Sequence, residues 1–118
     1  MNIDNLISVV AVINNNADII ESYIKDTTDV MKKSYANYEM VLIDNGSTDN
    51  TISKVKEIQK EITNIRLTIL SKQYDDEVTY LAALNNCIGD FVVLMDVNYD
   101  PPFLIPQLVE KSLSGDDV

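Results

Sequence analysis

Four short polar segments carry the residues of this sequence that could do chemistry. Each follows a hydrophobic run; the first is a run of amides, and the other three contain carboxylates. The segments are Asn14–Asn16, Asp44–Asp49, Ser71–Glu77 and Asp96–Asp100. Acidic and amide side chains with few basic neighbours are typical of a divalent cation site built from oxygen ligands. A nucleoside diphosphate could then bind through that cation, although the protein itself is acidic.

The same segments have a plainer interpretation. Asn, Asp, Gly and Ser are the residues that turns and helix N-caps require between strands and helices. The segment that begins at Asp96 has the strongest claim to function, because it directly follows the most hydrophobic run, where an unpartnered carboxylate is costly to hold. Residue types and spacing alone leave a nucleotide site, a metal site and an ordinary loop open.

Alternating elements must position these segments. Hydrophobic, β-branched runs predict four strands, at 6–13, 38–43, 65–70 and 91–95. Stretches with helical spacing follow them, at about 17–34, 51–62, 81–88 and 101–113. This order predicts an α/β fold, with an open, mainly parallel, Rossmann-like sheet and helices on both faces. Ligands of such sheets bind beyond the carboxyl ends of the strands, where the four polar segments lie.

Length and composition exclude several other classes. The 118 residues suit a single domain, with 114–118 expected to be a frayed tail or a truncation point. Nineteen Asp and Glu against nine Lys and Arg give a net charge of −10, which disfavours nucleic acid and anionic membranes as partners. The absence of His excludes Ser–His and Cys–His nucleophile systems. We find no signal peptide or membrane span, and expect a cytoplasmic protein whose single Cys87 is a buried, inert thiol.

Three motifs resemble glycosyltransferase family 2. They are Ile7–Asn15, Val41–Thr51 and the stretch from Leu84 through Gly89-Asp90 to Asp96, and the similarity extends from about Leu6 to Val109. The resemblance implies the GT-A fold, of which this chain would be the amino-terminal, donor-binding half. It also implies inverting transfer of a sugar from a nucleotide diphosphate. Members similar to polyprenyl- or dolichol-phosphate sugar synthases are closest in character, because of the motif Ser71–Tyr74, Glu77, and Asp96 followed by Pro101-Pro102.

The resemblance also assigns roles to individual positions. Asn15 would lie beside the nucleobase, Asp44 would contact the base or ribose, and Lys72 would approach the donor. Asn45 stands where the family has a second acid. Asp96 and Asn98 occupy the first and last positions of the Asp-x-Asp motif. The implied metal is Mg²⁺ or Mn²⁺, held by Asp96 and Asn98, with Asp100 as a substitute ligand.

Departures from the family pattern keep an alternative open. Asn45 and Asn98 are amides where acids are usual, and Asp75 stands where the family has Gly. An amide oxygen can coordinate a cation but brings no charge, so metal binding should be weaker. These departures favour a non-catalytic, degenerate module that binds or scaffolds another transferase. An unrelated doubly wound domain is disfavoured, because no Gly-x-Gly-x-x-Gly follows the first strand.

The family's catalytic base and its acceptor-binding half lie beyond the segment that matches. We therefore assign no catalytic residue, and expect these 118 residues to be inactive alone while a full-length protein transfers a sugar to a lipid-phosphate, glycan or polysaccharide acceptor. A half domain would leave an interface open, so we also expect self-association.

Overall fold

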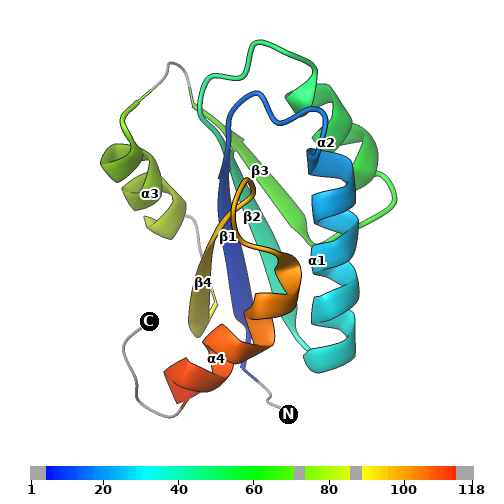
Figure 1. Ribbon diagram of the computed structural model, residues 1–118, viewed down its shortest axis with the longest axis vertical. Coiled ribbons are helices and arrows are strands. Elements are labelled where there is room, and N and C mark those ends of the chain that lie inside the picture. Colours follow the sequence, from blue (N-terminus) through cyan, green and yellow to red (C-terminus); the bar gives the residue numbers. More distant parts are fainter. Residues whose placement is uncertain (1–4, 71–73, 86–88, 114–118) are drawn as a thin grey trace.

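The computed structural model describes residues 5–70, 74–85 and 89–113. Its centre is a four-stranded parallel sheet in the order β3-β2-β1-β4 (Figure 1). The strands are β1 (Ile7–Ile13), β2 (Tyr38–Asp44), β3 (Ile65–Ile69) and β4 (Phe91–Asp96). The helices are α1 (Ile20–Ser34), α2 (Thr51–Gln59), α3 (Asp76–Asn85) and α4 (Ile105–Leu113), with a 3-10 turn, η1 (Pro102–Leu104), before α4. The predicted α/β fold with a parallel sheet is confirmed.

The strand order creates a switch point at the middle of the sheet. The chain proceeds from β1 to β2 to β3 in one direction, and then returns to place β4 on the other side of β1. Helix α3, which makes this return, therefore lies on the opposite face of the sheet from α1 and α2, so the chain leaves the carboxyl ends of the strands toward both faces. In open α/β sheets this divergence forms the crevice in which ligands bind.

Helices cover the two faces of the sheet unequally. Helices α1, α2 and α4 pack on one face, whereas α3 lies on the opposite face against β1 and β2 (Figure 1). Double coverage explains why β1 is hydrophobic at every position except Ser8, since both its odd and its even residues are buried or nearly so. Within the described ranges, no helix is long and apolar enough to cross a membrane.

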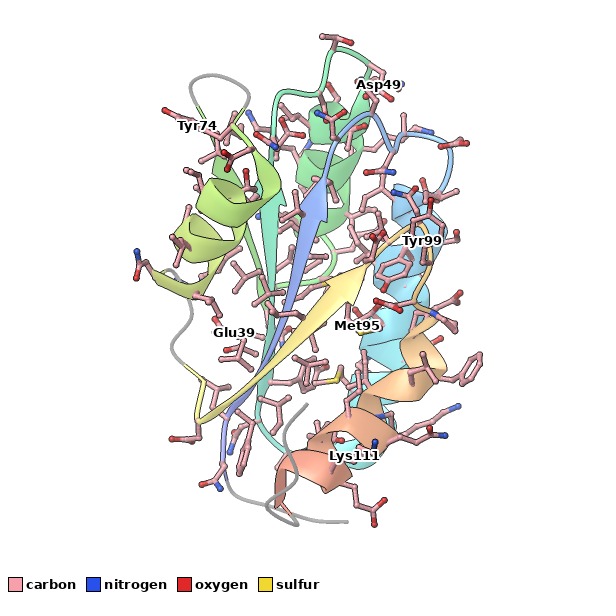
Figure 2. The ribbon with its side chains drawn as sticks, turned by 60° about the vertical axis from the view of Figure 1, so that its left-hand side comes forward. Glu39, Asp49, Tyr74, Met95, Tyr99 and Lys111 are labelled. Carbon is pink, nitrogen blue, oxygen red and sulfur yellow. The ribbon has the colours of Figure 1, made fainter. Side chains whose placement is uncertain are left out.

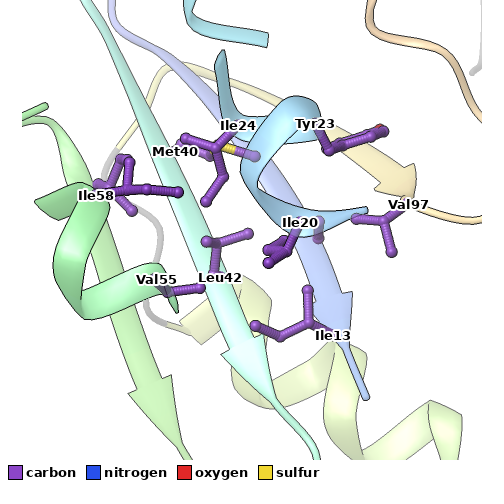
Figure 3. Packing of buried hydrophobic residues seen from close by; sticks show 11 residues of the cluster. Ile13, Ile20, Tyr23, Ile24, Met40, Leu42, Val55, Ile58 and Val97 are labelled. Atoms are coloured by element: carbon purple, nitrogen blue, oxygen red, sulfur yellow. The ribbon is translucent and has the colours of Figure 1, made fainter. Parts of the chain in front are cut away.

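The main core lies between the sheet and the helices α1 and α2. Ile13 and Leu42 of the sheet meet Ile20 and Ile24 of α1 and Val55 of α2 (Figure 3). All five side chains are fully buried, and burying each contributes about 1.5–3 kcal/mol relative to exposure. This packing holds the amino termini of α1 and α2 against the carboxyl ends of β1 and β2.

Helix α3 differs from the prediction. The sequence pattern predicts a helix at 81–88 that Gly89 caps, whereas α3 begins at Asp76 and is described to Asn85; 86–88 lie outside the described residues. Its early start has a local cause at Asp75, whose Oδ1 accepts the Val78 N–H at 3.0 Å and whose carbonyl accepts the Thr79 N–H at 3.0 Å. Asp75 thus acts as an N-cap, a role that side-chain oxygens fill well.

Gly89 instead joins the starts of β1 and β4. Its N–H donates to Ser8 Oγ at 2.9 Å, and the same hydroxyl donates to the buried Glu39 carboxylate. Glu39 also pairs with Arg66, with 2.9 Å between Oε1 and Nε. A Cβ at Gly89 would clash with Ser8 Oγ and lie 2.8 Å from Ser8 N. Only glycine fits at this position without displacing β1.

We predict that Gly89→Ala lowers the free energy of unfolding by about 1–3 kcal/mol, the usual cost of overpacking. Urea unfolding followed by circular dichroism measures it. Thr63→Ala, at an exposed turn position, serves as the control and should change stability by less than about 0.5 kcal/mol. A Gly89→Ala protein as stable as the wild type would contradict the close approach of Gly89 to Ser8.

Candidate functional site

Hydrogen bonds join the loops at the carboxyl ends of the strands into one platform. We call this platform the carboxyl edge; it comprises residues 14–19, 44–51, 74–75 and 96–101. Figure 2 shows Asp49, Tyr74 and Tyr99 at this end of the sheet, with Glu39 and Lys111 toward the other. The edge contains all of the predicted site residues except Lys72, which lies outside the described residues.

Asn15 joins the loop after β1 to the loop after β2 through hydrogen bonds. Its backbone adopts a left-handed conformation with φ of 52°, which Asn tolerates better than most residues. Its N–H donates to Ser47 Oγ at 2.9 Å. Its Oδ1 accepts the N–H groups of Thr48 at 2.7 Å and Asp49 at 3.2 Å. An exposed side chain therefore orders the turn that precedes α2.

Asn16 reaches from the same loop to α2 and to β4. Its N–H donates to Thr51 Oγ1 at 2.9 Å, and its carbonyl accepts the Ile20 N–H at 2.9 Å, in the first turn of α1. Its Nδ2 donates to Asn98 Oδ1 at 3.1 Å. Sequence reasoning did not single out Asn16, because nothing in a run of three Asn marks the one that will be buried. Asn16 is the link across the switch point between β1 and β4.

Asp44 is a buried carboxylate at the end of β2. It accepts the Ser47 N–H at 3.1 Å and the Ser47 hydroxyl at 2.5 Å. Gly46, with φ of 84°, allows the tight turn between these residues. Because burial of an unpaired carboxylate is costly, these bonds explain how Asp44 is held there. Its neighbour Asn45 bonds to Tyr74 through its carboxamide, with Nδ2 donating to the Tyr74 carbonyl.

Asp49 closes the other side of this turn. Its carboxylate accepts the Thr51 hydroxyl, the Thr51 N–H at 3.0 Å and the Ala17 N–H at 3.2 Å. The hydrogen bond from the Thr51 side chain, aided by those backbone bonds, holds the pKa of Asp49 below its ordinary value. Because the folded-state pKa is depressed, the contribution of Asp49 to stability is present at neutral pH and is lost as acid protonates it.

The segment after β4 folds back on itself. Asp96 Oδ1 accepts the Asn98 N–H, and Asp100 Oδ2 accepts the Asp96 N–H, both at 2.9 Å. Tyr23 of α1 donates its hydroxyl to the Asp100 carbonyl at 2.8 Å. Burial, together with the charges of Asp100 and Asp96, raises the pKa of Tyr23. The spacing of Tyr23 on α1 predicts only a core residue, so its reach to Asp100 is visible only in the structure.

An open hollow of about 230 Å³ lies beside this segment. Tyr23 forms one wall, and the turn from Val97 to Pro102 forms the rest. The exposed ring of Tyr99 stands at its rim. Of the two carboxylates of the segment, Asp100 lines the hollow, next to Asn98.

Asp96, Asn98 and Asp100 provide the oxygen donors that hard divalent cations take. Within the described ranges, no three carboxylate, Cys or His side chains gather to form a complete metal site. Asn98 contributes a neutral oxygen, already bonded to Asn16. A carboxylate can coordinate a cation while it also accepts hydrogen bonds. This donor set therefore fits a divalent cation that takes its remaining oxygen ligands from a diphosphate or from water.

We predict that Asn15→Ala lowers the free energy of unfolding by about 1–2 kcal/mol. The change places Ala in a left-handed conformation and removes the acceptor for two N–H groups. Asn15→Gly is the matched control, because it keeps the conformational freedom and loses only the acceptor; it should cost less. Thermal or urea unfolding of the two variants provides the measurement. Equal stability of Asn15→Ala and wild type would contradict this role.

Comparison with known proteins identifies the class. The model of the family described as Glycosyl transferase family 2 matches residues 8–118. An undecaprenyl-phosphate 4-deoxy-4-formamido-L-arabinose transferase from Pseudomonas fluorescens is 31% identical over 114 residues. These cover 95% of this chain but 33% of the relative, so the chain spans about a third of that protein's length.

Solved structures agree in fold. Glucosyl-3-phosphoglycerate synthase from Mycobacterium tuberculosis, in complex with Mn²⁺ and UDP, matches with a TM-score of 0.70 and 25% identity, over 94% of this chain and 40% of that one. The mannosyltransferase PcManGT from Pyrobaculum calidifontis, in complex with GDP-Man and Mn²⁺, matches with a TM-score of 0.69 and 23% identity, over 80% of this chain and 28% of that one. The expected GT-A glycosyltransferase architecture is confirmed, and this chain belongs to glycosyl transferase family 2.

Proposed function

We propose that this chain is the donor-binding part of an inverting glycosyltransferase. It would bind a nucleotide-diphosphate sugar whose sugar passes to a lipid-phosphate, glycan or polysaccharide acceptor. The observation that carries the proposal is the carboxyl edge itself, where Asn16 and Asn98 connect the loops after β1 and β4 beside Asp96. The nucleotide complexes of the M. tuberculosis and P. calidifontis enzymes support the same ligand class.

Each site residue receives a role within this proposal. Asn15 is exposed at the end of β1, where a nucleobase would lie, and the buried Asp44 and Asn45 follow at the neighbouring end of β2. Lys72 would approach the donor from the chain that follows β3. Asp96 would face the diphosphate from β4. The catalytic base that accepts the acceptor's proton is not assigned to any of these residues.

A divalent cation, Mg²⁺ or Mn²⁺, completes the proposal. Asp96 would be its principal ligand, with Asn98 and Asp100 beside it. When bound, such a cation stabilises the negative charge that develops on a diphosphate leaving group. A chain with a net charge of −10 repels a free diphosphate. A cation held by Asp96 would supply the positive charge that attracts the donor. The Mn²⁺ in both named structures supports this choice of metal class.

The alternative is a non-catalytic binding module. The observation in its favour is that the Asn98 oxygen already accepts a hydrogen bond from Asn16 at 3.1 Å, so the last position of the motif serves the fold. Such a module would bind nucleotide weakly and without a metal requirement. We propose a cytoplasmic location for either form, since the lone cysteine and the composition are usual for a reducing compartment.

We predict that a nucleoside diphosphate binds this chain only in the presence of Mn²⁺. Calorimetric titration of UDP, GDP and dTDP, each with and without Mn²⁺, measures it. Asp96→Asn should weaken the binding at least about tenfold, because it removes a charge-assisted contact. Asp29→Asn is the matched control: it removes the same charge from an exposed position on α1 and should leave affinity unchanged. Metal-independent binding that survives Asp96→Asn would contradict the proposed donor site.

We also propose that the chain self-associates through the open side of β4 and α3. Val92 and Leu94 of β4 are 38% and 46% exposed, and α3 adds Val78, Leu81 and Leu84 at 43–56%. Strand β4 is an edge of the sheet, and exposed apolar edges invite pairing. The acidic charge opposes association, so salt should promote it.

Size-exclusion chromatography with light scattering tests this prediction. We expect a dimer or larger species whose fraction rises with protein concentration and with salt. The double variant Leu81→Glu with Leu94→Lys should be monomeric, because it places charges in the apolar surface. Salt at 0.5 M shortens the Debye length to roughly 4 Å and so screens the repulsion between the acidic chains. A wild-type chain that remains monomeric at high concentration in this salt would contradict self-association.

A further inference from the structure

The carboxamide of Asn45 is paired with both backbone polar groups of a single residue, Tyr74. Its Nδ2 donates to the Tyr74 carbonyl at 2.9 Å, and its Oδ1 accepts the Tyr74 N–H at 2.9 Å. The backbone of Asn45 is equally occupied, because its N–H donates to the Ile13 carbonyl at 2.9 Å and its carbonyl accepts from the Asn14 side chain. Asn45 is buried, at 5% exposure. One residue thus connects the end of β1, the end of β2 and the chain that enters α3.

This pairing requires an amide. A carboxamide carries N–H donors and a carbonyl acceptor side by side, so it can bond to the carbonyl and the N–H of Tyr74 at the same time. An ionised carboxylate has only acceptors. It could accept the Tyr74 N–H, but its second oxygen would face the Tyr74 carbonyl without a proton between them. The acid that is usual in the family at this position could not form the contact seen here.

The contact controls where the chain leaves the carboxyl edge. Leu70 donates its N–H to the Asp44 carbonyl at 3.1 Å, and Tyr74 is held by the next residue, Asn45. Tyr74 immediately precedes Asp75, the N-cap of α3. The chain between β3 and α3 is therefore attached to the end of β2 at two successive residues. Loss of the second attachment would free the start of α3 from the edge.

We propose that Asn45 is a positioning residue for the nucleotide site, acting through Tyr74 rather than by touching the ligand. Its carboxamide holds the chain before α3 against β2, and so fixes the wall of the site on the side of Asp44. This inference rests on the proposed nucleotide-binding function. It also reinterprets the departure of Asn45 from the family pattern, which becomes a specific contact of this chain instead of a sign of degeneration.

The test is Asn45→Asp, the substitution that brings the sequence closer to its family. At pH 8 the introduced carboxylate should break the pairing, so that the Tyr74 amide exchanges hydrogen at least tenfold faster and nucleotide affinity with Mn²⁺ falls at least tenfold. At pH 5 the protonated carboxyl can again donate to the Tyr74 carbonyl, and both properties should recover toward the wild type. Burial, the facing Tyr74 carbonyl and the charges of Asp44 and Asp75 raise the pKa of the introduced group, whereas the Tyr74 N–H lowers it. We expect the raising effects to prevail, so that recovery begins above the usual Asp range.

Two further variants separate positioning from general stability. Asn64→Asp is the matched control, because Asn64 Nδ2 also donates to a backbone carbonyl, that of Tyr38 at 3.2 Å, at the opposite end of the sheet. It should reduce stability without changing nucleotide affinity or Tyr74 exchange. Asn45→Ala should release Tyr74 equally at both pH values. Affinities are compared with the wild type at the same pH, which removes the pH dependence of metal binding.

The outcomes distinguish the two proposals. If the wild type binds no nucleoside diphosphate with Mn²⁺, the proposed function is wrong. The positioning role is then wrong as well, even if slow hydrogen exchange of the Tyr74 amide demonstrates the pairing with Asn45. If the wild type binds and Asn45→Asp at pH 8 binds equally well, or leaves Tyr74 exchange unchanged, the positioning role is wrong. Asn45→Asp could unfold at pH 8. If it then refolds at pH 5 and Asn45→Ala does not, the result supports the pairing with Tyr74. If Asn45→Asp does not refold at pH 5, the result contradicts the pairing.

Discussion

Every parallel strand in this sheet ends at the same edge, and the backbone groups left there must find hydrogen-bond partners. The chain meets much of this requirement with short amide and carboxylate side chains, and the amides also join one loop to another. Asn15 takes the N–H groups of the turn before α2, Asn16 bridges to Asn98 after β4, and Asn45 pairs with Tyr74 before α3. The loops that would hold a ligand are consequently fixed to one another before any ligand arrives.

The amides and the carboxylates of the carboxyl edge differ in the charge that they bring to it. The amides join the loops without adding charge, while Asp96 and Asp100 place negative charge on the segment after β4, where Asp100 lines the hollow that Tyr23 borders. The proposed cation would offset the repulsion between this charge and a diphosphate. Because Asn98 is neutral, the diphosphate would supply more of the ligands of that cation. The proposed metal requirement would thus follow from the composition and from the hydrogen bond that already holds Asn98.

Sequence alone predicted the four strands, the parallel sheet and the edge at which Asn15, Asp44 and Asp96 lie, because hydrophobic periodicity reports burial directly. The start of α3 was missed, since the cap at Asp75 is a local hydrogen bond that periodicity does not register. Asn16 and Tyr23 were also missed as site residues. Their roles depend on contacts with Asn98 and Asp100, about 80 positions away, and pairs so distant leave no local signal.

If a nucleoside diphosphate and a divalent cation meet beside Asp96, Mn²⁺ should report their position. The measurement is the paramagnetic broadening of amide NMR signals by substoichiometric Mn²⁺, with UDP or GDP present. We expect the signals of Asp96–Asp100 and Asn16 to broaden strongly and the nucleotide to enhance this effect. The signals of Asn37 and Gly89, at the opposite end of the sheet, should remain sharp. Broadening spread over the acidic surface, or broadening that the nucleotide leaves unchanged, would contradict a shared nucleotide and metal site at Asp96.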